Sequence, residues 1–470
     1  MRRTFVLPAA CAVALFFGAG RAGADALGIP DVIPSADTAP PLPTVLQLLT
    51  GVDLTLLDVA VTDADLVGDG TDDTVPLMVD DPSMLVVDDD RVQCPNAQFT
   101  RINDAVAVAP PGAIIRVCPG LYRESVQITK PGLFLQAPRQ QGQATQCQSP
   151  AIPDPTQEAI VVYNTPASPN VFFGFDVEAG NVTIEGFTIQ PDPTIASSQL
   201  GIGIFTSPAF SGYDIRHNVA QNNSIGFDVH SHGENVTYVR ENCLRNNNLH
   251  AAPGGFGIFS NIGLANAHIE NNFCTGQRAF CILLTGGPNV NVQVTHNSSV
   301  NDATIGLNAT TNFSIDHNKV SNPTNTGILI GAGVSSGEVS FNNLSGGPSS
   351  GHGISIRAAQ VASNAITPPS GISFKSNKVV GFAWDGIRLA DASNQNTLVT
   401  NRVENNGMSG MHATDQSSAN TIQNNHMRGN ATLDCQDDTH GAGTSGTANF
   451  WIRDIGFTEF PAGICKHGNE

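Results

Sequence analysis

The sequence predicts an all-β chain wound into a right-handed parallel β-helix of roughly ten or more coils. Short β-prone runs that end at Asn recur from Asn218 to Asn425, with a step close to 24 residues. A Gly followed by an apolar residue recurs with the same spacing. Strands this short bury an apolar face only when each pairs with its counterpart in the next coil, and the usual crossover preference makes the coiling right-handed. A propeller would need a longer period and more than the 6% of aromatic residues found here.

The repeated Asn residues are expected to stack in one column at a turn. Asn tolerates left-handed backbone geometry, and its amide can hydrogen-bond to the next Asn of the column. Two longer steps require loops, at residues 250–255 and 358–370. The expected column is Asn218, Asn242, Asn272, Asn297, Asn318, Asn343, Asn377, Asn401 and Asn425.

The first 90 residues indicate export and an irregular leader. Residues 1–24 combine a basic start, an apolar stretch and a small-residue cleavage site after Ala24, which is typical of a secretory signal peptide. The mature protein is therefore expected to be secreted, periplasmic or at the cell surface. Residues 25–90 hold fifteen Asp and no Glu, Lys or Arg, which favours a partly disordered acidic leader. Its stretch 63–73, DADLVGDGTDD, offers oxygen ligands that suit Ca²⁺, and a solvated loop is the alternative.

The β-helix is expected over residues 91–432, with a closure at each end. Residues 100–109 carry apolar side chains at helical spacing and predict a capping helix over the first coil, with Thr100 as its N-cap. Residues 433–470 follow the last repeat and are expected to form a C-terminal cap.

Eight cysteines remain after the expected signal peptide, and an even number favours disulfides in an exported protein. Cys94 and Cys118 flank the expected helix and first strand, so a bridge between them would hold the helix on the first coil. Cys435 and Cys465 are expected to close the C-terminal cap. The sequence leaves open the pairing of Cys147, Cys243, Cys274 and Cys281.

Composition also limits the partners. A formal net charge of −19 argues against nucleic acid, because phosphates would be repelled. No apolar run after the signal peptide reaches the length needed to span a bilayer. The chain is expected to be a monomer whose partner is an acidic polysaccharide or another glycan, with no cofactor other than the Ca²⁺ considered above.

Residues from about 94 to 435 resemble the pectin-lyase-like superfamily of right-handed parallel β-helix proteins. The resemblance is carried by FTRINDAVAVAPPGAIIRVCPGLYRESVQI (99–128) and by the Asn and Gly repeats. The superfamily includes pectate and pectin lyases, polygalacturonases, pectin methylesterases, mannuronan C5-epimerases and phage tailspikes. The resemblance therefore implies a fold rather than one activity.

The stretch GFDVHSH (226–232) resembles the GFDPHD stretch of mannuronan C5-epimerases and their alginate-acting relatives. Asp228 and His230 match the Asp and His of that motif, which implies a role for His230 in proton transfer at C5 of a uronate. The Tyr that is the partner of the His in the family is Ile225 here. Polar decoration of a repeating strand is the alternative.

Strand alternation places Asp228 and His230 on the outward face, where they are expected to project into the largest groove. His232 should lie nearby on the same side. Phe259 is expected one coil further on and Arg357 further along the same face. These side chains would suit contacts to a charged polysaccharide that crosses several coils.

A second candidate cluster comes from WDGIRLADASN (384–394) and GMHATDQ (410–416). Arg388 and His412 are expected on adjacent coils, with Asp385, Asp391 and Asp415 nearby in the sequence and Asp391 as a substrate contact. A lyase needs a base beside the uronate carboxylate and a cation for the charge that develops, and His412 and Arg388 suit these roles. A surface salt bridge is the alternative.

Two hypotheses of function follow from these patterns. The first is an exported enzyme, a lyase or C5-epimerase, that acts on a uronate polysaccharide. The second is a non-catalytic β-helix that binds glycan or a surface, as an adhesin or envelope protein does, and the replacement of the family's Tyr by Ile225 favours it. Formation of unsaturated product from uronans separates the two.

Overall fold

The computed structural model describes residues 84–138, 147, 152–249, 254–302, 304–358, 367–414 and 416–467. The chain divides into two units, residues 1–79 and 80–470, and all described residues belong to the second. The expected signal peptide, the Ca²⁺ candidate stretch and the leader up to residue 83 lie outside the described residues. So do most of the two expected loops, at 250–253 and 359–366. Within the described part of the chain, no helix is long and apolar enough to cross a membrane.

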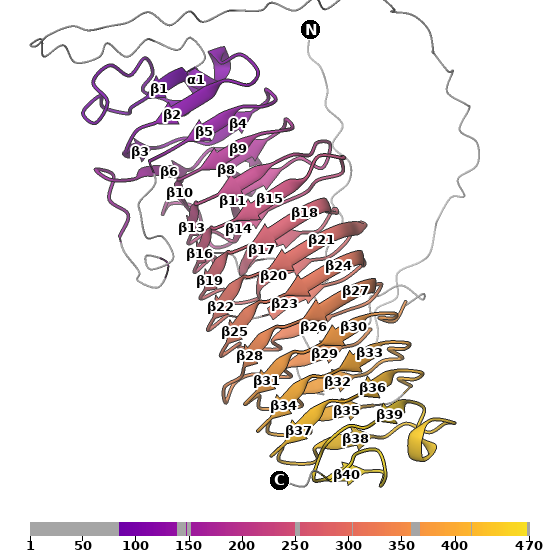
Figure 1. Ribbon diagram of the computed structural model, residues 1–470. Helices are drawn as coiled ribbons and strands as arrows, with labels where there is room; N and C mark the ends of the chain where they lie inside the picture. The colour runs from indigo at the N-terminus through magenta and orange to yellow at the C-terminus, as the bar shows by residue number, and fades with distance from the viewer. Residues whose placement is uncertain are drawn as a thin grey trace, which may run out of the picture. The chain divides into compact units, whose positions relative to one another are not determined.

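Three long parallel sheets run the length of the second unit (Figure 1). Sheet A has 14 strands, from β1 (Met84–Val87) to β39 (Phe450–Ile452), and sheet B has 12, from β3 (Gly120–Tyr122) to β37 (His426–Arg428). In each sheet a strand pairs with the equivalent strand of the next coil. The chain therefore forms the parallel β-helix that the repeat predicts.

Sheet C, also of 14 strands, carries the clusters described below. One of its strands, β7 (Pro166–Ser168), lies off the main path and pairs antiparallel with β8. The others are β4 (Val126–Ile128), β8 (Val171–Val177), β11 (Leu200–Thr206), β14 (Ile225–Asp228), β17 (Phe256–Ser260), β20 (Phe280–Leu284), β23 (Thr304–Leu307), β26 (Ile328–Ile330), β29 (Ile354–Ile356), β32 (Ile387–Leu389), β35 (Met411–Ala413), β38 (Cys435–Asp437) and β40 (Glu459–Phe460).

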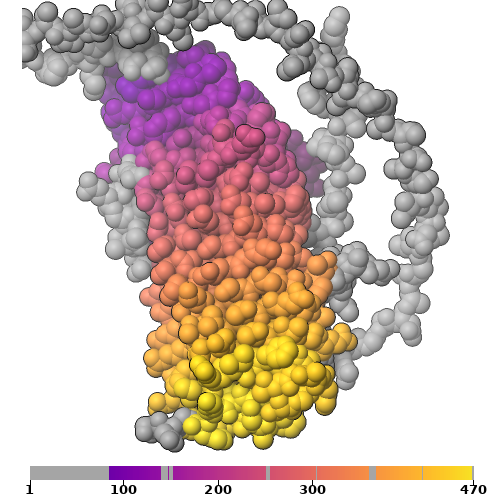
Figure 2. Space-filling model, turned by 45° about the vertical axis from the view of Figure 1, so that its right-hand side comes forward, coloured from indigo at the N-terminus to yellow at the C-terminus, as the bar shows by residue number. Residues whose placement is uncertain are grey.

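The main hydrophobic core of the described residues runs through the coils. The strands alternate as expected: in β26, Ile328 and Ile330 are buried and Leu329 between them is partly exposed. The inward residues stack in register from coil to coil, as Ile328 does on Ile354. In the space-filling view the colours follow the chain in order along the stack (Figure 2). Burial of these stacked apolar side chains is the main source of stability, at about 25 cal/mol for each Å² removed from water.

A buried column of Asn side chains links the turns between sheets A and B. At a typical step, the backbone N–H and the Nδ2 amide of Asn272 both donate to Oδ1 of Asn297, each at 3.0 Å. Nδ2 of Asn297 donates in turn to the carbonyl of Ile269 at 2.8 Å. The column runs through Asn218, Asn242, Asn272, Asn297, Asn318, Asn342, Asn377, Asn401 and Asn425 and ends at Asp454.

Two details of the predicted column were wrong. Its sixth member is Asn342, whereas Asn343 is the exposed first residue of β28 (Asn343–Ser345). Left-handed backbone occurs at the residue before each column Asn, such as Phe341 with φ 52°. The position therefore requires Asn for its amide, which satisfies buried backbone groups of neighbouring coils, and not for its backbone freedom.

The N-terminal end differs from the predicted boundary. Residues 84–87 were assigned to the leader. They instead form β1, which pairs with β2 (Ile114–Val117) and opens sheet A. The helix α1 (Ile102–Val108) covers the first coil as predicted, but its N-cap is Arg101 and not Thr100, and it has no side-chain cap. Glu124 accepts the first helical N–H instead, at 2.7 Å from Ile102 N.

The C-terminal residues extend the solenoid beyond the predicted end at residue 432. β38, β39 and β40 add strands to sheets C and A. The segment therefore completes a further coil before it closes the stack.

The described residues contain four disulfides, and disulfides are typical of an exported protein. Two of them are the pairs expected at the ends of the solenoid, and the other two settle the cysteines that the sequence left open. They join Cys94 to Cys118, Cys435 to Cys465, Cys147 to Cys243 and Cys274 to Cys281.

Candidate functional site

Asp228 and His230 are buried, and the expectation that they project into an open groove is wrong. Asp228 ends β14 and lies in register between Phe205 and Phe259 of the neighbouring strands, as predicted for the latter. Its residue surface is only 6% exposed, and that of His230 is 0% exposed. Alternation predicts the side of a strand correctly but not what packs against that side.

His230 belongs to a buried chain of polar groups. Its Nε2 lies 3.0 Å from Asp228 Oδ1, and its Nδ1 lies 3.2 Å from Ser260 Oγ. Its ring meets Phe205 edge-on, and its backbone N–H donates to Thr206 Oγ1 at 2.8 Å. These contacts tie three adjacent coils together, which is a structural role.

The other expected substrate contacts are dispersed. Phe259 is buried and stacks on Phe256, with ring centroids 4.6 Å apart. His232 is exposed beyond the end of β14, and Asp391 is exposed in the turn after β32, with φ 51°. Among the described residues, no hydrogen bond or ion pair joins Asp391 to Arg388 or His412.

Arg388 and His412 stand side by side, as the sequence predicts. They are the outward middle residues of β32 and β35 and are paired in register. Ser355 precedes them in this column and Gln436 follows. We call the group of His352, Asp385, Arg388, His412 and Asp438 the imidazole cluster.

Asp385 is the centre of the imidazole cluster. Its side chain is only 1% exposed, and its Oδ1 accepts the backbone N–H of Ser409 at 3.0 Å. Its Oδ2 lies 3.3 Å from Nδ1 of His412 and 3.5 Å from Nδ1 of His352. Nε2 of His412 lies 2.9 Å from Oδ2 of Asp438. One buried carboxylate therefore faces two imidazoles from neighbouring coils.

The rim of the cluster is cationic and aromatic. Arg388 Nη1 lies 3.5 Å from Nε2 of His352, and Arg357, expected as a substrate contact, is exposed at the end of β29. The indole of Trp384 is edge-on to the ring of His352, with centroids 5.0 Å apart, and Trp384 is 52% exposed. The face thus offers a flat apolar surface beside two guanidinium groups.

The two imidazoles are driven toward opposite protonation states. Burial lowers the pKa of His352 to about 4, helped by the charges of Arg388 and Arg357 and opposed by Asp385. Burial also acts to lower the pKa of His412, but hydrogen bonds to Asp385 and Asp438 outweigh it, so that this pKa is raised. Near neutral pH, His352 is therefore a neutral base while the imidazolium form of His412 is favoured.

Asp385 stays ionised between them. Burial acts to raise the pKa of its carboxyl, but hydrogen bonds from His412 and from the Ser409 N–H outweigh this effect and lower the pKa. The negative charge of Asp385 is therefore available to orient both imidazole rings.

The sequence predictions missed the roles of His352, Trp384 and Asp438, and placed Asp385 only in the neighbourhood of the cluster. For His352 and Asp385 the sequence does contain a pattern that predicts their contact. His352 and Asp385 each precede the Gly of a Gly–apolar repeat, in HGI (352–354) and DGI (385–387). Residues at equivalent positions of the repeat lie next to one another in adjacent coils. The pattern therefore predicts that the side chains of His352 and Asp385 are neighbours.

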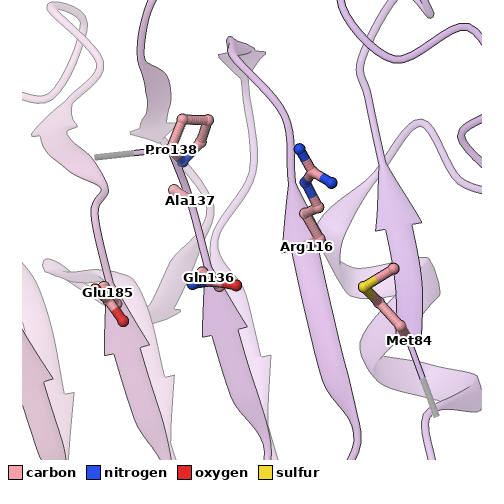
Figure 3. Close-up of a pocket in the computed structure, with 6 residues that line it drawn as sticks. All are labelled: Met84, Arg116, Gln136, Ala137, Pro138 and Glu185. Atoms are coloured by element: carbon pink, nitrogen blue, oxygen red, sulfur yellow. The ribbon is translucent and has the colours of Figure 1, made fainter. Parts of the chain in front are cut away.

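A separate hollow of about 340 Å³ lies on sheet A near its N-terminal end (Figure 3). It shares no residue with the imidazole cluster or with the Asp228 and His230 pair. The residues that line it are Met84, Arg116, Gln136, Ala137, Pro138 and Glu185.

Comparison with known proteins finds one partial match to a family model and several similar solved structures. Residues 369–451 match a family model described as periplasmic copper-binding protein (NosD). This is a minor part of the chain, and it includes Asp385, His412 and Asp438 but not His352. No curated protein sequence matches the chain.

Several solved structures are similar at low identity. The A-module of mannuronan C-5 epimerase AlgE4 from Azotobacter vinelandii is 12% identical, with 75% of this chain and 80% of that chain covered and a TM-score of 0.40. A double mutant of the tailspike protein of E. coli bacteriophage HK620, in complex with a pentasaccharide, is 12% identical, with 80% and 71% covered and a TM-score of 0.48. An alpha-1,3-glucanase from Streptomyces thermodiastaticus is 15% identical, with 78% and 64% covered and a TM-score of 0.42.

The three sheets of equivalent strands define the class of this protein. It is a right-handed parallel β-helix, as the sequence predicts. Identities this low concern the fold and not the activity.

Proposed function

We propose that this chain is an exported protein that binds an acidic polysaccharide on the outer face of sheet C and moves a proton at C5 of a uronate residue there. The reaction is β-elimination, as in a lyase, or inversion at C5, as in an epimerase. The observation that carries this proposal is the pair of imidazoles, His352 and His412, whose pKa values are shifted in opposite directions around Asp385. Pairs of titratable groups with diverging pKa values mark acid and base roles.

Each group of the imidazole cluster has a distinct task in this proposal. Neutral His352 accepts the C5 proton, and the His412 imidazolium supplies a proton by way of the part-exposed Asp438 carboxylate that its Nε2 contacts, to the leaving glycosidic oxygen or to the opposite face of C5. Asp385 holds both rings in place. Arg388 and Arg357 bind the uronate carboxylate and stabilise the negative charge that develops when the proton leaves.

Trp384 supplies the apolar part of the binding surface. Its indole is half-exposed at the rim of the cluster and is fixed there by its contact with His352. A flat aromatic surface beside polar groups suits the C–H face of a sugar ring, while the neighbouring guanidinium groups suit its carboxylate.

Copper, which the matched family model names, does not fit the imidazole cluster as it is arranged. Among the described residues, only two groups have three His, Cys, Asp or Glu ligand atoms within 4.8 Å of one another, and neither belongs to this cluster. Both nitrogens of His412 already face carboxylates, and the partner oxygen of His352 is shared with His412. No step of the proposed reaction passes through copper.

Residues 1–24 are part of the proposal as the export signal. Removal of this segment after Ala24 would release the β-helix into the oxidising compartment that its four disulfides require.

The variants His352→Ala and His412→Ala test the proposal. Alginate and pectate are the substrates, with product formation and polymer binding measured separately. We expect each substitution to reduce turnover by about 100-fold or more, the usual contribution of a general acid or base, while polymer binding falls much less. His426→Ala, which removes an exposed imidazole on sheet B, is the control and should behave as the parent does.

The outcomes separate the two hypotheses of function. Binding of a uronan by the parent without any product would favour the non-catalytic, glycan-binding alternative. Absence of binding to every uronan would contradict both.

A further inference from the structure

We infer that a Ca²⁺ site lies in the loop that follows β1, at the N-terminal end of the stack (Figure 1). The ion joins this loop to the turn between β2 and β3. The site is independent of the proposed function, because the imidazole cluster lies around β32 and β35, in later coils. It is also distinct from the acidic stretch 63–73, which lies outside the described residues. The ligands are oxygen atoms of Asp88, Asp89, Asp90, Gln93 and Pro119.

Three consecutive carboxylates converge in this loop. One ligand oxygen from each of Asp88, Asp89 and Asp90 lies within 4.8 Å of the other two. Among the described residues, no Lys, Arg or His forms an ion pair with any of the three. Like charges this close repel one another, and a divalent cation between them removes the repulsion.

Backbone amides hold the two inner carboxylates and leave an oxygen of each for the ion. Asp88 is 0% exposed; its Oδ2 accepts the N–H of Cys94 at 2.5 Å, and its Oδ1 points at the side-chain amide of Gln93. Oδ2 of Asp89 accepts the N–H of Leu121 at 2.9 Å, while its buried Oδ1 has no hydrogen-bond partner. A buried anionic oxygen without a partner is costly, and coordination of a cation satisfies it. Carboxylates oriented by hydrogen bonds are typical of metal ligands.

The side-chain amide of Gln93 faces three oxygen atoms. With Oε1 turned toward them, four oxygens face one another, at 3.3 Å from Asp88 Oδ1 and 3.2 Å from both Asp90 Oδ1 and the carbonyl of Pro119. Oxygens that share a Ca²⁺ ion at 2.3 to 2.6 Å lie about 3 Å from one another, so these separations fit one coordination sphere. With the amide turned over, Nε2 would donate to the same oxygens and would replace the ion. The buried Oδ1 of Asp89 lacks a donor in either orientation.

The ligand set and its exposure favour Ca²⁺. Asp90 is exposed at the outer side of the loop, so an ion reaches the site from solvent. All five ligands are oxygens, which suit a hard cation, and water completes the six to eight positions that Ca²⁺ takes. Mg²⁺ is smaller and keeps several of its own waters, so it suits a site with this many protein oxygens less well.

The ring of Tyr122 makes the site detectable. A Cβ atom on Gly120 would overlap Oδ1 of Asp89 and lie 3.2 Å from Cε2 of Tyr122, so the carboxylate and the ring are neighbours. Excitation of this ring should therefore sensitise the luminescence of Tb³⁺, a probe that takes oxygen ligands as Ca²⁺ does. Residues 25–90 contain no Tyr or Trp, so an ion bound in the stretch 63–73 has no such ring beside it in the sequence.

The test is titration of the full exported protein, freed of metal with EDTA, with TbCl₃ and then with CaCl₂. We expect one Tb³⁺ ion to give the sensitised signal and Ca²⁺ to displace it with a Kd on the order of 10⁻⁴ M, as in extracellular Ca²⁺ modules. MgCl₂ at the same concentration should displace much less.

Three substitutions and one control locate the ion. Asp88→Asn and Asp90→Asn should each weaken Ca²⁺ binding by about tenfold or more, because each removes a charged ligand. Gln93→Glu should bind Ca²⁺ at least as tightly as the parent, because the new carboxylate faces the ion. Asp104→Asn, which removes an exposed carboxylate of α1 outside the site, is the control and should bind as the parent does.

Three results would overturn the inference: no signal that Ca²⁺ displaces in the parent, parent-like binding by both Asp88→Asn and Asp90→Asn, or loss of binding in Gln93→Glu. The last result would show that the amide of Gln93 is a donor to the carboxylates. Circular dichroism of each variant confirms that the coils are intact, and the exposed Asp90 keeps the test decisive if a change at the buried Asp88 prevents folding. Because binding is measured without polysaccharide, failure here does not bear on the proposed reaction.

Discussion

The Nδ1 atom of His412 lies 3.3 Å from the Oδ2 atom of Asp385, which projects from the preceding coil. Asp385 is buried and cannot exchange this contact for water, so its charge acts on the imidazole with little screening. The same oxygen faces His352 from the other side. A single carboxylate thus influences the protonation of both groups that the proposed reaction uses.

The proposed reaction should show a bell-shaped dependence on pH. Turnover should rise as pH passes about 4, where His352 loses its proton, and fall above the raised pKa of His412, where that imidazolium loses its proton. Asp385→Asn removes the negative charge that favours the imidazolium, so the alkaline limb should move to lower pH. The measurement is kcat/KM against pH for both proteins. An alkaline limb that stays in place would show that Asp385 does not set it.

Trp384→Ala should weaken polymer binding by about tenfold, because an aromatic stacking contact contributes on the order of 1 kcal/mol beyond its buried area. Equilibrium binding of a uronan oligosaccharide measures this. Phe450→Ala provides the control, since Phe450 is similarly exposed but lies at the end of sheet A. An equal loss of binding affinity in the two variants would show that the polymer does not bind specifically at Trp384.

Asn297→Leu should destabilise the fold. Leu cannot accept the two hydrogen bonds from Asn272 or donate to Ile269, and each buried polar group left without a partner costs about 1 to 3 kcal/mol. Chemical denaturation measures the change in the free energy of unfolding. Asn343→Leu, at an exposed position outside the column, should change it by about 0.5 kcal/mol or less. Similar effects of the two substitutions would mean that the column does not stabilise the coils.

His230→Ala should lower stability without a specific loss of turnover. The substitution empties a buried site and leaves Asp228 and Ser260 without their imidazole partner, at a cost of about 2 to 5 kcal/mol. His232→Ala, two residues on and exposed, should have little effect. If His230→Ala instead lost turnover while its free energy of unfolding stayed unchanged, His230 would have the catalytic role that its motif suggests.

The fold was predictable because the sequence period equals the length of a coil. Each Asn of the repeat marks the same turn, so counting from Asn218 to Asn425 locates most coils. The boundaries were less predictable, since β1 carries no Asn or Gly marker and is separated from β2 by the capping helix. The choice of Asn343 over Asn342 shows the same limit, because two adjacent Asn residues cannot be told apart by period alone.

The residues of the site were predictable only where strand alternation determines the face of the sheet on which a side chain lies. Alternation placed Arg388 and His412 together on the outer face of sheet C. It also placed Asp228 and His230 outward, but it carries no information on what covers that part of the sheet. His352 and Asp385 precede their strands, where alternation does not apply, and only the alignment of the Gly repeats brings them together.

The most direct test of the central claim is to incubate alginate and pectate with the parent protein in D₂O and to examine the polymers by NMR. Abstraction of the C5 proton leaves either deuterium at C5 or an unsaturated terminal residue, so one spectrum detects both the epimerase and the lyase reaction. We predict one of these signals with the parent and its loss with His352→Ala. A parent protein that binds a uronan but leaves C5 unlabelled and every chain end saturated would contradict the proposed proton transfer.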